Sequence, residues 1–185
     1  DAITGEVLYY NATIKHLGEH AHGGSHNCDE QNSNITSAKT FTNMVSANAA
    51  TRYSGAQTIQ TTLNGASYIL SDTSRGYGIE TLNLNKGTNY STATNFTDTD
   101  NNWTAAEYNN TNKDNAALDA HWGAEKTFDY FLTTHGRYSY NNLGATISSY
   151  VHYSVSYNNA FWNGAVMTYG DGSGTVFDAL SALDV

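Results

Sequence analysis

One segment, residues 114–135, carries a helical period in a chain whose other apolar segments are short. It predicts an amphipathic helix, because one face repeats every three to four residues, at Leu118, Trp122, Glu125, Phe128 and Leu132. Asp114 or Asn115 can cap its start through a side-chain oxygen. Gly136 can close its end in the left-handed conformation. A single helix of this length leaves the rest of the core to strands.

The strand signals are short and separated by turn residues. Residues 58–63, 67–70 and 79–84 favour strands, and Asn64-Gly65 is the strongest hairpin signal in the chain. Residues 147–157 alternate apolar and polar side chains, which predicts a further strand with one more apolar face. We therefore expect the α+β class, with a mostly antiparallel sheet and one long helix.

Composition narrows the functional classes. The 185 residues contain 39% apolar and 14% charged residues, with Asn, Thr, Ser, Gly and Tyr abundant, a mixture typical of secreted β-rich proteins. The eight Lys and Arg residues are scattered and form no basic stripe, so we expect no nucleic-acid partner. No apolar run approaches membrane-spanning length, so we expect no membrane association. Cys28 is the single cysteine, which excludes an internal disulfide.

Residues 16–50 are poor in apolar side chains and are interpreted as a His-, Gly- and Asn-rich linker. Within thirteen residues this segment gathers side chains that bind transition metals, namely His16, His20, His22, His26 and Cys28. Their spacing matches no standard zinc pattern. A solvated linker and a metal-binding cluster therefore both stay open.

Two further segments have binding chemistry. Asp98 and Asp100 alternate in an Asn-rich loop, where carboxylates can converge on Ca²⁺; an exposed polar turn is the alternative. Residues 158–172 place the aromatic pair Phe161-Trp162 beside polar amides and between glycines. This pattern indicates either a binding surface or a β-hairpin whose aromatic side chains pack inward.

Several of these segments, taken in order, resemble the thermolysin-like neutral zinc metallopeptidases. The matching segments are residues 119–131, 151–154, 158–164, 167–172 and 183–185. The resemblance extends over residues 50–185 and is most specific after residue 115. It implies that residues 51–185 form the N-terminal lobe of the catalytic domain, truncated before the zinc helix. Residues 1–15, which read as a turn and a strand, look like the end of the family's propeptide.

The resemblance also implies roles for individual residues. Asn159 and Ala160 match positions that hold the substrate backbone, and Trp162 belongs to the same strand. Phe177 and Leu180 match positions near the hydrophobic specificity pocket. Asp98, Asp100 and Asp184 match calcium ligands. His121 and His152 lie in family motifs without zinc-binding roles, so we interpret both as structural.

The family's H-E-x-x-H pattern, whose histidines bind zinc and whose glutamate activates water, does not occur in the 185 residues. In the family it follows the position of Val185. The first hypothesis is therefore the N-terminal part of a secreted zinc endopeptidase, not competent alone, whose partners are the C-terminal half and peptide substrates. The alternative is a non-enzymatic extracellular fragment that self-assembles, for instance into a filament, through an exposed β-edge. Whether the chain is an enzyme stays open.

Overall fold

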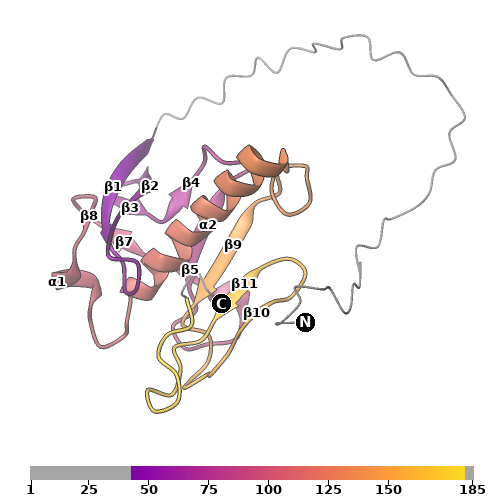
Figure 1. The fold of residues 1–185 in the computed structure, drawn as a ribbon. Helices are drawn as coiled ribbons and strands as arrows, with labels where there is room; N and C mark the ends of the chain where they lie inside the picture. Colours follow the sequence, from indigo (N-terminus) through magenta and orange to yellow (C-terminus); the bar gives the residue numbers. More distant parts are fainter. Residues whose placement is uncertain (1–42, 182–185) are drawn as a thin grey trace, which may run out of the picture. The chain divides into compact units, whose positions relative to one another are not determined.

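The structure is a computed structural model that describes residues 43–181 of the chain (Figure 1). Its elements in chain order are β1 (Met44–Ala50), β2 (Ala56–Asn64), β3 (Ser67–Ile69), β4 (Ser71–Asp72), β5 (Ile79–Asn83), the 3₁₀ turn η1 (Tyr90–Thr92), β6 (Thr94–Asn95), β7 (Thr97–Asp98), β8 (Asn102–Trp103), α1 (Ala105–Tyr108), α2 (Asn115–His135), β9 (Ile147–Val151), β10 (Ala160–Trp162) and β11 (Met167–Tyr169). The propeptide-like segment 1–15, the His16–Cys28 cluster and Asp184 lie outside the described residues.

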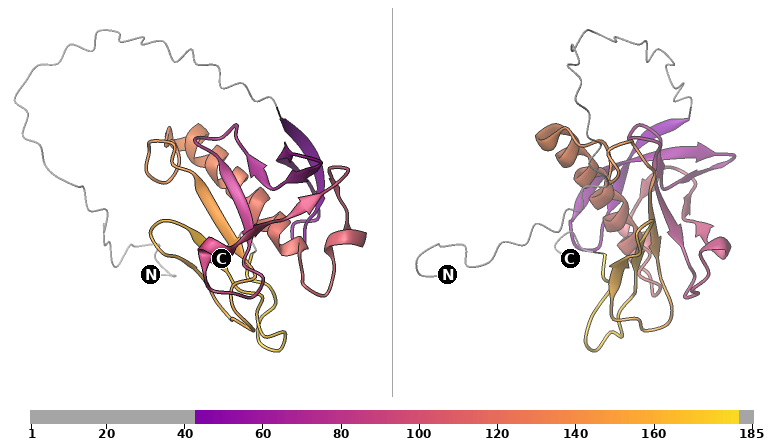
Figure 2. Two further views of the ribbon diagram at one scale, coloured as in Figure 1. Left: turned by 180° about the vertical axis from the view of Figure 1, so that it is seen from behind. Right: turned by 90° about the vertical axis from the view of Figure 1, so that its right-hand side faces the viewer.

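The strands form two sheets, one with the order β7-β3-β2-β1-β8 and the other with the order β10-β11-β9-β5-β4, to which β6 adds by pairing with β5. Among the residues that the structure describes, six strand pairs are antiparallel; the parallel pairs are β1 with β8, β5 with β9 and β9 with β11. The α+β class, the mostly antiparallel pairing and the single long helix are thus confirmed. Figure 2 shows that β10, β11 and the loops around them lie at the opposite end of this unit from β1 and β2.

The predicted hairpin is present between β2 and β3. Asn64 pairs with Ser67, so the two-residue loop is Gly65-Ala66. Gly65 has φ 65°, and a left-handed first loop residue is the position that a type II′ hairpin reserves for glycine. The Asn64-Gly65 signal therefore predicted the correct hairpin, but the two loop residues lie one position later, at Gly65-Ala66.

Two segments differ from the sequence prediction. The strand predicted over residues 147–157 ends at Val151, because His152, Ser154 and Ser156 adopt left-handed φ values of 60°, 57° and 51°, which extended pairing cannot accommodate. Strand β1 lies within residues 16–50, the range interpreted as a linker. Its inward side chains are only alanines, Ala47 and Ala49, so it carries little of the apolar signal by which strands are recognised.

Helix α2 begins and ends where predicted, but the side-chain bond expected at its start is absent. Gly136 has φ 62°, and its N–H donates to the carbonyl of Leu132 at 3.0 Å. Asp114 has a helical conformation and makes no side-chain cap bond. Its carboxylate instead contacts His152 and Asn110. Asp114 is therefore the N-cap residue, as predicted, but the predicted side-chain capping bond is absent because the carboxylate bonds the buried His152.

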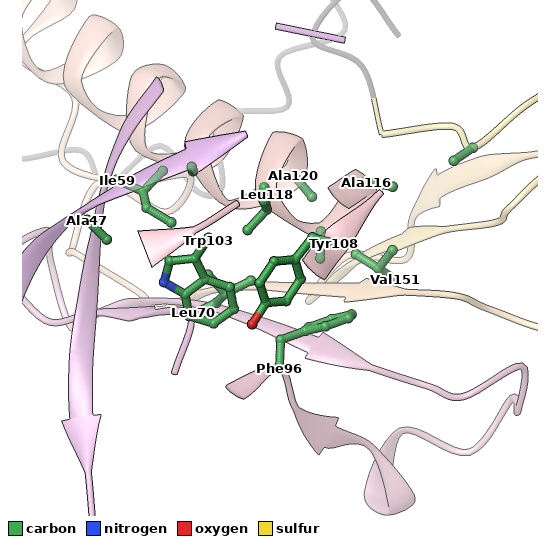
Figure 3. Close-up of a cluster of buried hydrophobic side chains, with 13 residues drawn as sticks. Ala47, Ile59, Leu70, Phe96, Trp103, Tyr108, Ala116, Leu118, Ala120 and Val151 are labelled. Carbon is green, nitrogen blue, oxygen red and sulfur yellow. The ribbon is translucent and has the colours of Figure 1, made fainter. Parts of the chain in front are cut away.

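The core lies between α2 and the two sheets. Figure 3 shows Trp103 and Tyr108 at its centre, with ring centroids 4.9 Å apart, surrounded by aliphatic side chains from α2 and both sheets. Helix α2 packs on β5, β9 and β2, and Leu118 on its inner face is fully buried. Among residues 43–181, no helix has the length and apolar composition needed to cross a membrane.

Candidate functional site

Strand β10 is an edge strand, because within the described residues it pairs only with β11. Phe161 lies opposite Thr168. Hydrogen bonds flank this pair on both sides: Gly170 N–H donates to the Asn159 carbonyl (3.1 Å), and Asn163 N–H donates to the Val166 carbonyl (3.2 Å). These bonds fix the phase of β10, that is, which of its residues bond β11 and which do not.

Along a strand of an antiparallel pair, the backbone N–H and C=O groups of one residue bond the neighbouring strand, and those of the next residue point away from it. The phase therefore turns the backbone groups of Phe161 toward β11. The backbone groups of Ala160 and Trp162 face the open edge. The amide oxygen of Asn159 accepts the Ala160 N–H at 2.9 Å, which places the exposed Asn159 side chain on this same edge.

A cavity of about 530 Å³ lies beside the edge, between α2 and β10–β11. Small residues of α2 leave this space open, and aromatic and aliphatic side chains line most of the rest, among them Ala120, Gly123, Ala124, Tyr140, Ile147, Ala160, Phe161, Trp162 and Met167. The Trp162 side chain is 41% exposed and packs edge-on against Tyr140, with 4.9 Å between ring centroids. Trp162 thus faces this open space, whereas the Phe161 ring packs edge-on against Tyr153 and Tyr157, with ring centroids 5.6 and 6.3 Å away.

The two predicted specificity residues lie elsewhere. Phe177 is 49% exposed in the loop after β11. Leu180 donates its N–H to the Gly170 carbonyl at 3.0 Å. Neither residue lines the cavity beside β10. The structure therefore brings Asn159, Ala160 and Trp162 together, while a pocket formed by Phe177 and Leu180 stays a prediction.

The predicted calcium loop has its carboxylates turned to its own backbone. Asp98 is buried and accepts the N–H groups of Asp100 (2.9 Å) and Asn101 (2.6 Å) and the hydroxyl of Tyr108 (3.1 Å). Asp100 accepts the Asn102 N–H at 3.0 Å. Between residues 43 and 181 no three acidic, histidine or cysteine side chains are grouped closely enough to hold a metal. Calcium binding by Asp98 and Asp100 therefore stays a prediction.

Sequence reasoning missed the anchoring role of Asp119, which is buried on α2. Its two oxygens accept three backbone N–H groups and one hydroxyl from the loop between β1 and β2, contributed by Arg52, Tyr53 and Ser54. An acidic residue between the apolar positions of a helix was the available signal. Through these bonds Asp119 fixes the loop between β1 and β2, which borders the core.

His121 is a satisfied core residue, which fits the structural interpretation. Its Nδ1 accepts from the Thr81 hydroxyl (3.0 Å), and its Nε2–H donates to the Gln60 carbonyl (2.9 Å). Burial lowers its pKa to about 4, so the ring is neutral near pH 7. Its 3.5 Å approach to Glu125 is for this reason not an ion pair. Burial raises the pKa of Glu125 to about 7, although the Gln60 N–H and Arg75 favour its charged form.

His152 is also buried, but its partners are charged. Its Nδ1 lies 2.6 Å from Asp171 and its Nε2 lies 3.1 Å from Asp114. Burial lowers its pKa, but the bonds to the two carboxylates outweigh burial and raise it above the ordinary value.

Comparison with known proteins assigns this architecture. Residues 46–185 match the family model described as thermolysin metallopeptidase, catalytic domain. The chain belongs to this family. The resemblance inferred from the sequence is confirmed, and the match begins five residues before the boundary that we placed at residue 51.

Three relatives illustrate the similarity. The chain is 53% identical to bacillolysin of Brevibacillus brevis over 127 residues, covering 68% of this chain and 22% of the relative. It is 46% identical to bacillolysin of Bacillus cereus over 125 residues, covering 68% and 21%. It is 42% identical to the transglutaminase-activating metalloprotease of Streptomyces mobaraensis over 161 residues, covering 82% and 20%. The chain thus spans about a fifth of the length of these relatives.

Proposed function

We propose that this chain forms the N-terminal lobe of a secreted zinc endopeptidase and contributes the strand edge that binds peptide substrates. The observation that carries the proposal is the phase of β10, which leaves the backbone groups of Ala160 and Trp162 facing outward next to a cavity of about 530 Å³. An extended peptide that pairs with such an edge gains main-chain hydrogen bonds whatever its sequence, while a pocket beside the edge selects side chains.

Each predicted substrate-binding residue then has a defined task. The Ala160 carbonyl accepts a substrate N–H. The Asn159 amide, which now bonds the Ala160 N–H, rotates to hold the substrate backbone beyond the scissile bond. Trp162 shapes the wall of the groove. Phe177 and Leu180 contribute apolar surface to the specificity pocket, which favours cleavage on the amino side of apolar residues.

The hydrolytic chemistry needs residues outside this chain. In the proposed enzyme, zinc binds to an H-E-x-x-H helix in a C-terminal half, and that half covers the cavity between α2 and β10–β11. Asp98 and Asp100 contribute to one calcium site and Asp184 to another, each completed by further oxygen ligands.

A fusion protein tests the proposal. The 185-residue chain is joined to the C-terminal remainder of Brevibacillus brevis bacillolysin, and hydrolysis of an internally quenched apolar peptide is measured with and without zinc. We expect zinc-dependent hydrolysis by the fusion and none by the 185-residue chain. Asn159→Ala should raise KM by about tenfold, the equivalent of one backbone hydrogen bond.

Asn112→Ala, an exposed position in the loop between α1 and α2, is the matched control and should leave KM unchanged. Zinc-dependent hydrolysis by the 185-residue chain alone contradicts the proposal. So does a folded fusion that binds zinc and leaves the peptide intact.

A further inference from the structure

The environment of His152 specifies its charge. Both ring nitrogens lie within hydrogen-bond distance of carboxylate oxygens, Nδ1 at Asp171 and Nε2 at Asp114. A carboxylate only accepts, and a neutral imidazole carries a single N–H. Only the imidazolium donates to both partners. The side chain is almost completely buried, so water cannot take the place of a missing donor.

The two carboxylates belong to distant parts of the fold. Asp114 lies immediately before α2, and Asp171 lies in the loop that follows β11. His152 itself directly follows β9 and has a left-handed φ of 60°. A non-glycine residue keeps such a conformation only where its surroundings enforce it. The imidazolium therefore fastens the β11 loop to the start of α2.

The β11 loop in turn holds the entry to the candidate peptide-binding edge. The residues on either side of Asp171 donate their N–H groups to the segment before β10: Gly170 to the Asn159 carbonyl and Gly172 to the Tyr157 carbonyl, both at 3.1 Å. Ser173 N–H adds a bond to the Asn158 side chain at 2.6 Å. A displacement of Asp171 would thus move Asn159 through a single intervening residue, Gly170.

The packing leaves little room for compensating movement. A Cβ at Gly170 would lie 2.1 Å from the Tyr157 carbonyl oxygen, and one at Gly172 would lie 2.2 Å from the Phe177 carbonyl oxygen. Both positions are backbone-on-backbone contacts that need glycine. A close-packed loop of this kind transmits displacement and does not absorb it.

We propose that His152, as an imidazolium that bridges Asp114 and Asp171, is a positioning residue for Asn159 and β10, and that it makes peptide binding at this edge dependent on pH. This inference rests on the proposed peptide-binding role of β10. His152 touches no substrate in this scheme; it acts through Asp171 and the β11 loop.

The charge of His152 is set by the two carboxylates, and the remaining neighbours are one cation, whose charge a third carboxylate offsets, and one aromatic ring. Lys113 donates to the Asp171 carbonyl at 2.8 Å and pairs with Asp178 at 2.7 Å, so it neutralises a carboxylate that does not contact the ring. The ring of Phe96 packs edge-on at 5.7 Å. The pKa of His152 is raised above 6.5. The bridge is complete below the unfolded pKa near 6.5, and its contribution is lost as pH rises through the raised folded value.

The first test does not depend on peptide binding. Ring ¹⁵N shifts of His152 and amide hydrogen exchange are followed in the 185-residue chain from about pH 5.5 to about 8.5. We expect an imidazolium at the lower pH, and protection factors at Gly170 and Gly172, which correct for the base-catalysed intrinsic rate at each pH, that fall by about tenfold as the ring deprotonates. His152→Gln should show the low protection factors at all pH values, with those of the β1–β2 amides unchanged. Asp171→Asn is the second variant, and His135→Gln, on the last residue of α2, is the control.

The second test measures KM for the apolar peptide in the fusion protein over the same pH range. We expect KM to rise with pH in the wild type and to be high and independent of pH in His152→Gln, with a smaller change in kcat. A neutral His152 throughout, unchanged exchange in the variants, or equal KM profiles overturns the inference. A fusion with a charged His152 and protected amides that does not bind the peptide contradicts the proposed function instead.

Discussion

The buried Glu125 of α2 gives a stability prediction whose sign and size follow from its surroundings. Its Oε1 accepts the Gln60 N–H at 2.8 Å, Arg75 lies 3.7 Å away, and the side chain is almost wholly buried. Burial raises the pKa from 4.5 to about 7. A raised carboxyl pKa means that the folded state binds more protons than the unfolded state. The free energy of unfolding therefore falls as pH rises from about 4.5 to about 7.

The size of this effect follows from the same two values. Their difference corresponds to about 3 kcal/mol at pH 8. Glu125→Gln keeps the shape and an oxygen for the Gln60 N–H, and it cannot ionise. We expect the variant to be more stable than the wild type by up to about 3 kcal/mol at pH 8 and equal to it near pH 4.5.

Urea unfolding followed by tryptophan fluorescence across this pH range measures the difference. Glu107→Gln removes the same charge from exposed α1, keeps an oxygen for the capping box, and is the control. A Glu125→Gln stability gain that does not vary with pH would show that ionisation of Glu125 is not its cause. A loss of stability at pH 8 would show that the attraction between Glu125 and Arg75 outweighs burial.

Three further outcomes are expected. Asp119→Ala leaves three backbone N–H groups and a hydroxyl without their acceptor and should cost about 3–5 kcal/mol in urea unfolding, whereas Ser54→Ala, which removes one of these donors, should cost about 1 kcal/mol. Asp98→Asn together with Asp100→Asn should remove any calcium-induced rise in melting temperature, and a rise that persists would assign calcium to other ligands. The isolated chain should associate with increasing concentration through its open edge in analytical ultracentrifugation, and Trp162→Pro, which removes an outward N–H from β10, should reduce this association.

The sequence predicted the elements whose signal is local. Periodicity located α2 and its glycine stop, and turn chemistry located the β2–β3 hairpin. Strand β1 was missed because Ala47 and Ala49 are buried without bulky side chains. The end of β9 at Val151 was missed because residues with left-handed φ do not disturb the alternation of apolar and polar side chains from which the strand was predicted.

The residues of the candidate site could be predicted from the sequence, but their spatial arrangement could not. The resemblance to a family indicated Asn159 and Ala160, but their place on an open edge depends on the strand order and the ladder phase, which are long-range properties. The partners of His152 lie 38 and 19 residues away. No spacing rule predicts that the carboxylate of the N-cap residue Asp114 bonds this ring and not the first N–H groups of the helix.

Helix α2 connects the two sheets through polar contacts as well as through its apolar face. The neutral ring of His121 accepts from Thr81 in β5 and donates to Gln60 in β2, strands that belong to different sheets. Asp119 bonds the loop after β1, and Asp114 bonds the loop after β11 through His152. A chain with few large apolar residues thus has its sheets oriented by buried hydrogen bonds, each of which requires one protonation state. Since His121 must be neutral and His152 charged, the edge that we propose for peptide binding is held in place only within the pH range where both conditions are met.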